Sequence, residues 1–376
     1  MEIPLDVLKL VATFLVVRKK KLLDWIPENK ITYQNWQSLS KNPEAIHLLK
    51  ANPKKIDWFQ FSDNPNAHHL LETVPLDFIT LNKPRAVIDL CMLSRNPNAI
   101  NFLEANPHLI NWKYLSGNPN AIHLLEPVSL DPKKINWGQL SKNPNGIHLL
   151  EKMLKQNPNL LAAPLAAIDW YNLSQNPRAI HLLETVALDT DKIDGEGLAM
   201  NPNPNCIQLF EKYNKYDICN WFHLSKNPSA IHLLELEKNK EKINWSSLSA
   251  NPCAIHLLKA NFNKIDWEWL PLNPNKEAIH LLEQNFDKFD KMKSKWTSLK
   301  WFRLSENPNA LHILKQNMNK INWARLSRNP SIFEIDIKQY NIDITEKATM
   351  LLLTLDKLLL TSIYKNKRKK RKNNKN

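Results

Sequence analysis

Histidine recurs at one position of a repeated phrase in this 376-residue chain. Histidine side chains can act as metal ligands or as proton carriers. Nine of the twelve histidines share one place in a repeated phrase, namely His47, His69, His123, His148, His181, His232, His256, His280 and His312. A zinc site needs ligands about 2 Å from one ion, whereas neighbouring helix layers lie roughly 8–10 Å apart. No Cys or carboxylate recurs beside these histidines at ligand spacing, so we predict no metal site. We interpret them as a structural ladder in which each imidazole bonds a backbone or Asn group; a binding or pH-sensitive face is the alternative.

Tryptophan and serine also recur. Stacked Trp side chains are typical of single-strand nucleic-acid binders, but here each Trp shares a helical face with the Leu three residues later, which predicts a core position. The Ser that follows this Leu has no general base beside it within its repeat, so we interpret it as part of a turn and not as a nucleophile. No P-loop, GxGxxG, HExxH or GxSxG motif occurs, and only five Gly are present. The sequence therefore predicts no enzyme and no cofactor.

These residues belong to the phrase W-x-x-L-S-x-N-P-x-A-I-H-L-L-E, which occurs twelve times. In every repeat Asn precedes the proline of the phrase. These twelve prolines are Pro43, Pro65, Pro97, Pro119, Pro144, Pro177, Pro202, Pro228, Pro252, Pro274, Pro308 and Pro330. Seven residues before the Pro stands Trp in ten repeats: Trp36, Trp58, Trp112, Trp137, Trp170, Trp221, Trp245, Trp267, Trp301 and Trp323. Leu90 and Gly195 take this place in the other two. We number the repeats 1 to 12 in this order.

Two capping signals predict two short helices in each repeat. Asn is a good N-cap and Pro is favoured at the first helical position, so Pro43 should open a helix through Ala45 and Leu49. Asn or Asp also precedes the Trp position in eleven repeats, with Lys300 as the exception, which predicts a second helix over W-x-x-L-S. Such short helices persist only when they pack on their neighbours.

The sequence thus predicts an all-α fold, an α-solenoid of about twelve two-helix repeats of roughly 22–26 residues with terminal capping helices. At helix spacings of roughly 8–10 Å, twelve repeats would form an elongated, curved rod. We expect an N-terminal helical segment at residues 1–34, the repeat array at 35–335, C-terminal capping helices at 336–364 and a disordered basic tail at 365–376.

Positive charge is concentrated at the ends of the chain. The formal net charge is +14, and twelve Lys and Arg lie in residues 18–21 and 365–376. The nearly neutral remainder argues against an RNA-reading array. Two interpretations of the tail stay open: a solvated end, or a nuclear-import signal or anion tether formed by Lys367, Arg368, Lys369, Lys370, Arg371 and Lys372.

The sequence also bears on the compartment. No run of 18 uncharged apolar residues predicts a membrane span, and the N-terminus has its basic run after its apolar stretch, unlike a signal peptide. The four cysteines, at positions 91, 206, 219 and 253, lack ligand spacing and are expected to be free, buried thiols. We therefore expect an intracellular protein with no membrane partner.

The repeated phrase, from Trp36 to about Ile335, resembles a short repeat found in uncharacterised proteins of giant nucleocytoplasmic DNA viruses. This resemblance implies a viral protein in the host cytoplasm or nucleus, and it implies little about activity.

A second resemblance is local. The stretch IPLDVLKLVATFL is similar to the first helix of an F-box, with Ile3, Pro4, Val7, Leu8, Phe14 and Leu15 at the matching positions. It implies docking on a cullin-type ubiquitin ligase, whereas fewer than 35 residues precede the first repeat Trp. The alternative is a helix that caps an open end of the solenoid.

Taken together, these features predict a non-enzymatic scaffold that binds another protein of the host or of the virus. The first alternative is an F-box-type substrate receptor with ubiquitin-ligase subunits as partners. The second is a structural protein that reaches nucleic acid only through its basic tail.

Overall fold

The computed structural model describes residues 4–71, 88–129, 131, 133–156, 168–186, 193–212, 220–291 and 297–373. The chain forms two compact units. Residues 25–332 make up one, the repeat array, and residues 1–24 together with 333–376 make up the other, the end pair. The two chain ends, which we expected to be separate segments, therefore belong to one unit.

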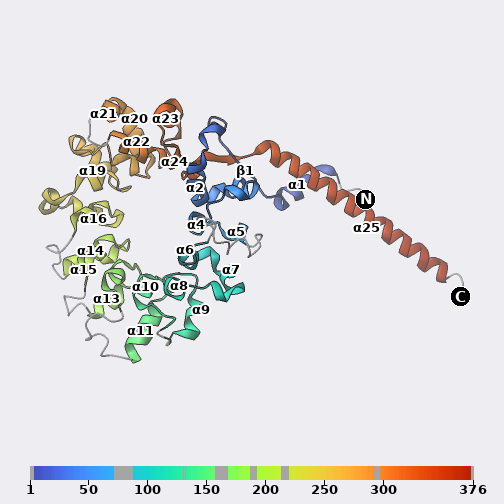
Figure 1. The fold of residues 1–376 in the computed structure, drawn as a ribbon, viewed down its shortest axis with the longest axis horizontal. Helices are drawn as coiled ribbons and strands as arrows, with labels where there is room; N and C mark the ends of the chain where they lie inside the picture. The colour runs from blue at the N-terminus through green and yellow to red at the C-terminus, as the bar shows by residue number, and fades with distance from the viewer. Residues whose placement is uncertain are drawn as a thin grey trace. The chain divides into compact units, whose positions relative to one another are not determined.

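The all-α prediction is confirmed, since helices dominate the described residues (Figure 1). The helices that start near the repeated Trp are α2 (Tyr33–Lys41), α4 (Trp58–Phe61), α6 (Leu90–Arg95), α8 (Trp112–Leu115), α10 (Trp137–Lys142), α12 (Trp170–Gln175), α14 (Gly195–Met200), α16 (Trp221–Lys226), α18 (Trp245–Ser249), α22 (Thr297–Glu306) and α24 (Trp323–Leu326). In repeat 10 a turn and a 3-10 helix over Leu270–Leu272 replace this helix.

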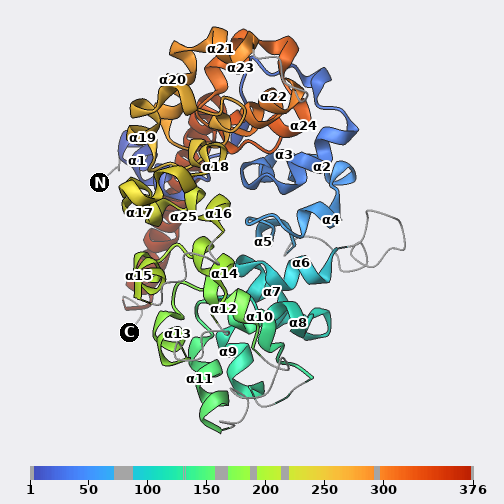
Figure 2. The same ribbon diagram turned by 90° about the vertical axis from the view of Figure 1, so that its left-hand side faces the viewer.

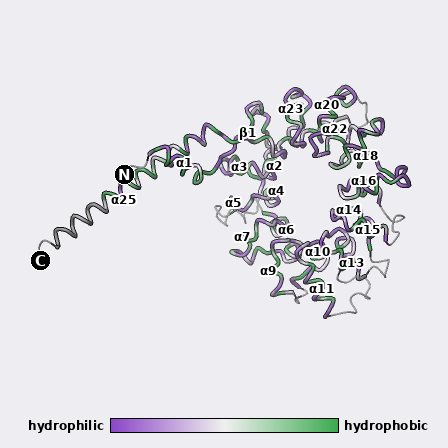
Figure 3. Tube along the Cα trace, turned by 180° about the vertical axis from the view of Figure 1, so that it is seen from behind, coloured by the Kyte–Doolittle hydropathy of each residue, from purple (hydrophilic) through white to green (hydrophobic). Residues whose placement is uncertain are grey.

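A second set of helices follows the Asn-Pro pairs. They are α3 (Ile46–Ala51), α5 (His68–Leu71), α7 (Ile100–Ala105), α9 (Ile122–Leu125), α11 (Ile147–Gln156), α13 (Ile180–Val186), α15 (Pro204–Lys212), α17 (Ile231–Glu235), α19 (Ile255–Ala260), α20 (Lys276–Gln284) and α23 (Leu311–Gln316), with α21 (Phe286–Lys291) as an addition after α20. Within the repeat array, the first set lies on the inner side and this second set on the outer side (Figures 1 and 3).

Both predicted caps form. The Asn42 side-chain oxygen accepts a hydrogen bond from the Glu44 amide at 3.0 Å, and Pro43 opens a 3-10 turn that leads into α3. Asp57 caps α4 by accepting from the Gln60 amide at 3.0 Å. The prediction is wrong for Asn35, which lies inside α2 because that helix begins at Tyr33 with Thr32 as its N-cap.

The Asn of each Asn-Pro pair also joins its repeat to the one before, a role the sequence analysis did not foresee. Its side-chain amide donates to two backbone carbonyls of the preceding repeat. One belongs to the Asn of that repeat's Asn-Pro pair, and the other belongs to the residue two positions before that Asn. In repeat 5, Asn143 donates to Ser116 O at 3.0 Å and to Asn118 O at 2.9 Å. The same pair of bonds is made by Asn64, Asn96, Asn118, Asn176, Asn201, Asn227, Asn251, Asn273, Asn307 and Asn329.

The repeated Ser forms a second link between repeats. Ser40 Oγ donates to Trp36 O of its own repeat at 2.8 Å and accepts from the Asp57 amide of the next repeat at 3.0 Å. The Ser therefore holds the start of the following helix, which explains its recurrence without a catalytic role. This second bond is made by Ser40, Ser62, Ser94, Ser116, Ser141, Ser174, Ser225, Ser249 and Ser305.

The repeat array closes on itself. Asn42 of repeat 1 donates to Ser327 O at 2.9 Å and to Asn329 O at 3.0 Å, both in repeat 12. These are the bonds that every other repeat makes with its predecessor. Helices α2 and α24 lie side by side accordingly (Figures 1 and 2). The expected elongated rod with open, capped ends is thus corrected, because the two ends of the array cover each other.

Residues ahead of repeat 1 complete repeat 12. In other repeats a Lys at the closing turn lies over the repeat's own Trp ring, as Lys55 does at 4.8 Å from the Trp36 ring centre and Lys264 at 4.8 Å from that of Trp245. Repeat 12 has no such turn of its own. Lys30, from the 3-10 turn Glu28–Lys30, lies 6.0 Å from the centre of the Trp323 ring instead.

In the end pair, α1 (Leu5–Leu15) packs on α25 (Ile337–Asn373), and β1 (Lys20–Leu22) pairs antiparallel with β2 (Phe333–Ile335). The sequence analysis missed these two short strands. It also expected disorder from residue 365, whereas α25 continues through Asn373, in keeping with the good helix propensity of Lys and Arg. Within the described residues, no helix is both long and apolar enough to cross a membrane.

Candidate functional site

The repeated histidines lie on the outer helices and pair with glutamates. His256 Nε2 lies 2.7 Å from Glu235 Oε1, and His123 Nε2 lies 2.5 Å from Glu104 Oε1, each bridging to the preceding repeat. His148, His181 and His312 make the corresponding bridge to Glu126, Glu151 and Glu283. The predicted partner is wrong at these five positions, because each imidazole bonds a Glu of the preceding repeat and not a backbone or Asn group of its own or the next repeat.

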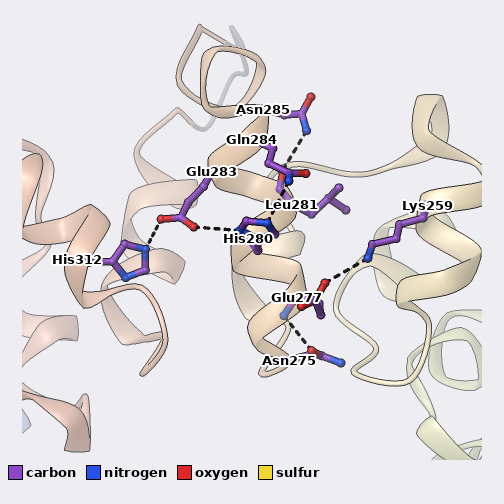
Figure 4. Close-up of polar contacts among 9 residues, drawn as sticks. All are labelled: Lys259, Asn275, Glu277, His280, Leu281, Glu283, Gln284, Asn285 and His312. Carbon is purple, nitrogen blue, oxygen red and sulfur yellow. Dashed lines mark hydrogen bonds and ion pairs between the residues drawn. The ribbon is translucent and has the colours of Figure 1, made fainter.

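Repeats 10 and 11 show this arrangement at close range (Figure 4). The carboxylate of Glu283 lies between two imidazoles, contacting His312 of the next repeat and lying 3.7 Å from His280 Nδ1 on its own helix. Lys259 of the preceding repeat bonds Glu277 at 3.1 Å. These side chains are about half exposed, and surface pairs of this kind contribute about 0–1 kcal/mol each. Among the described residues, no three His, Cys, Asp or Glu side chains are grouped so as to hold a metal ion.

The repeated Trp rings are covered by packing. Trp36, Trp58 and Trp301 are buried, and Trp112, Trp221, Trp245 and Trp323 are partly buried. A Lys ammonium lies over the ring of Trp36, Trp112, Trp221, Trp245, Trp301 and Trp323. A Trp that stacks on a base needs an open ring face, so burial and the neighbouring Lys favour a structural role for these Trp.

Lys300, the one exception at the second cap position, has a structural role. It lies inside α22 with 3% of its surface exposed, and its ammonium donates to Phe289 O at 2.5 Å and Asp290 O at 2.8 Å. Burial lowers the pKa of this Lys. Burial likewise lowers the pKa of Arg303, whose guanidinium donates to Glu268 O at 2.9 Å. Both groups therefore bond backbone carbonyls of neighbouring segments.

Among the cysteines, Cys206 is buried, Cys91 is partly buried and Cys253 is exposed, and all three are free thiols. The expectation of buried thiols is therefore wrong for Cys253, and Cys219 lies outside the described residues. Burial raises the pKa of the Cys91 thiol, so it is kept less reactive than an ordinary cysteine.

The F-box-like residues fall on two faces of α1. Leu8 is 4% exposed and packs with Ala12 against Ile344 and Ala348 of α25. Val7 and Leu15 are exposed, and Phe14 is 84% exposed. Pro4 is the N-cap of α1, and Ile3 lies outside the described residues.

The exposed residues of α1 are mostly apolar, with Asp6 as an exception. Leu10 is 62% exposed, and Leu5 and Val11 are exposed as well, as is Val17 just after the helix. On α25, the exposed large apolar side chains include Met350, Leu353, Leu358, Leu359 and Leu360. The end pair therefore carries an apolar surface that its own two helices leave uncovered. This is the feature of the described residues that most resembles a docking surface.

The six basic residues predicted as an import signal or tether, Lys367 to Lys372, lie on the last turns of α25. Their backbone is helical, and their side chains lie outside what the structure describes.

Comparison of the chain with models of protein families found no match. Comparisons with curated proteins and with solved structures found no match either.

Proposed function

We propose that the chain is a non-enzymatic scaffold that binds a partner protein through the exposed apolar face of α1. The exposure of Phe14, at 84%, is the observation that carries the proposal. Monomeric proteins rarely leave several large apolar side chains exposed together on one element unless another molecule covers them. The opposite face of α1 is sealed against α25 by Leu8 and Ala12, so the helix presents its apolar face on a fixed support.

The apolar face of α1 indicates what kind of partner would fit. The end pair contains sixteen Lys and Arg against eight Asp and Glu, but eight of the sixteen lie in residues 365–376, so the rest of the end pair is balanced in charge. We therefore expect a partner segment with an apolar stripe, such as an amphipathic helix that packs along α1.

An F-box-type substrate receptor is the second candidate. Pro4, Val7, Phe14 and Leu15 are exposed while Leu8 is buried, so four of the six matching side chains are available to a ligase subunit. In this version the partner on α1 would be a subunit of a cullin-type ligase, and the repeat array would hold the substrate. The two candidates share a surface and differ in what binds it.

Point variants test the proposal better than deletion of residues 1–24, because deletion would also uncover the α25 residues that α1 covers. Tagged full-length chain would be expressed in cells and its partners identified by mass spectrometry, for the native sequence, Phe14→Ser and Leu10→Ser. Phe59→Ser is the matched control, since Phe59 is an exposed aromatic residue of the repeat array. Binding of each purified partner would then be measured by titration calorimetry.

We expect the main partner to be lost with Phe14→Ser and Leu10→Ser and kept with Phe59→Ser. Ligase subunits among the partners lost would select the F-box version. Equal binding by all variants would contradict the proposal. Loss only when residues 367–372 are replaced by Gln would favour the alternative of a structural protein tethered to nucleic acid by its tail.

A further inference from the structure

The junction between repeats 12 and 1 contains a pocket lined by residues from both ends of the repeat array. Gln34, Gln37 and Ser38 reach it from α2, Arg325 and Arg328 from α24 and the turn after it, and Phe302 from α22. We call it the junction pocket. Two guanidinium groups and no carboxylate are among the described residues that line it. Such a pocket attracts an anion.

Arg325 is fixed in place at one side of this pocket. Its guanidinium lies 3.8 Å from the centre of the Phe302 ring and donates to Glu306 Oε2 at 3.1 Å. Stacking on an aromatic ring and one ion pair orient the planar group. Its remaining N–H donors stay available to a ligand, because a guanidinium has five.

Arg328 supplies the unsatisfied group. Its Nε is buried and has no hydrogen-bond partner, a condition shared by only two other side-chain atoms of the described residues, His68 Nδ1 and Ser247 Oγ. Protein atoms enclose this Nε, so a ligand in the pocket would be held by the other N–H donors of the Arg328 guanidinium.

A neighbouring pocket shows the contrast. It is lined by Asp290, Lys300 and Lys320 among others, and its charges already satisfy one another. Lys320 bonds both carboxylate oxygens of Asp290 at 2.7 and 2.8 Å, and Lys300 donates to backbone carbonyls. An anion would gain little there, so the excess of donors distinguishes the junction pocket from this neighbour.

We infer that the junction pocket binds a small anion of the phosphate class, independently of what binds α1. Arg328 and Arg325 are the charged donors, and the amides of Gln34 and Gln37 and the hydroxyl of Ser38 are the neutral ones. Arginine is suited to phosphate because its planar fork can donate two parallel hydrogen bonds. Because the donors come from both ends of the array, the bound anion stabilises the closed form.

Titration calorimetry of the full-length chain tests this, with inorganic phosphate, pyrophosphate and citrate as probes. We expect saturable binding of phosphate or pyrophosphate, weakened by about tenfold or more in Arg328→Gln, since the substitution removes a charged donor from the pocket. Arg95→Gln is the matched control, because Arg95 takes the same place in repeat 3, between Ser94 and Asn96, away from the junction. Binding should be unchanged in that variant.

Three outcomes would overturn the inference: no saturable binding of phosphate or pyrophosphate by the native chain, tighter binding of citrate than of both phosphates, or an equal loss in Arg328→Gln and Arg95→Gln. If Arg328→Gln does not fold, Gln37→Ala takes its place, with the same expected direction of change. A rise in melting temperature with pyrophosphate, present in the native chain and absent in the pocket variant, would support the stabilising role.

Discussion

At the scale of single residues, the Asn before each Pro contributes most to the order of the array. Asn143 is fully buried, and all three of its side-chain hydrogen bonds are to backbone atoms: it accepts from the Asn145 amide at 3.0 Å and donates to two carbonyls of repeat 4. Asn is the residue whose side chain offers an acceptor and two donors in so small a volume. Aspartate would keep the cap and lose both donors.

We predict that Asn143→Ala lowers the free energy of unfolding by about 3 kcal/mol, from one lost cap of about 1 kcal/mol and two buried carbonyls left unpaired at about 1 kcal/mol each. Asn98→Ala should cost less than about 1 kcal/mol, because the single bond of that side chain to Pro65 O is solvent-exposed. Chemical denaturation of both variants measures the difference. Equal losses would show that the ladder of buried Asn has no special role.

Lys300 should make stability depend on pH. Burial lowers its pKa in the folded state, below the ordinary value of 10.5, so between the two values the unfolded chain binds more protons. Stability therefore rises as the pH increases toward 10.5. In Lys300→Met this contribution is absent, so the native chain should gain stability relative to the variant across the alkaline range. Denaturation at a series of pH values measures it, and parallel curves would contradict the assignment.

The sequence predicted the caps at Asn42 and Asp57, because a cap acts within a few residues of its own helix. It did not predict the donation from Asn143 to Ser116 and Asn118, since the partner carbonyls lie in another repeat. The role of Lys300 had a visible signal, its departure from Asn or Asp, but nothing in the sequence placed Phe289 and Asp290 around it. The donors of the junction pocket had no signal of this kind.

At the scale of elements, the close packing of α12 and α14 depends on glycine. A Cβ at Gly197 would lie 2.6 Å from Tyr171 O and 2.8 Å from Ser174 Cβ, so the two helices could not stay as close together as they are. At Gly138 the nearest atoms would be 3.5 Å or more away, which is ordinary contact.

We predict that Gly197→Ala destabilises the chain by about 1–3 kcal/mol, the usual cost of overpacking, whereas Gly138→Ala is neutral or slightly stabilising because Ala is the better helix former. Thermal unfolding of the two variants provides the measurement. A stable Gly197→Ala variant would mean that α12 and α14 move apart freely.

Helix type and order could be predicted from the repeated phrase, because caps and apolar spacing are local signals. The pairing of α1 with α25 and of β1 with β2 could not, because each joins segments more than 300 positions apart. The sequence analysis expected disorder from residue 365 because of the high charge there, whereas α25 extends through Asn373. A helix that has already formed can continue into a segment rich in Lys and Arg, because adding a residue to a helix costs less than starting one.

At the scale of the whole array, closure distinguishes this chain from an open solenoid. A full turn shared among twelve repeats requires a rotation of about 30° per repeat. The sequence sets the number of repeats but does not reveal this angle, which explains why a rod was expected. Closure removes the two exposed apolar ends that an open array would have to cap.

The direct test of closure is the distance between repeats 1 and 12 in solution. Spin labels would be placed at Glu44→Cys and Ser331→Cys, two residues after Asn42 and Asn329, in a chain whose four native cysteines are replaced. Asn98→Cys with Asn120→Cys gives the reference, since these positions are equivalent in the adjacent repeats 3 and 4. Pulsed electron paramagnetic resonance should give the same short distance between the two spin labels in both pairs. A longer distance for the first pair, with the reference pair short, would contradict the closed array.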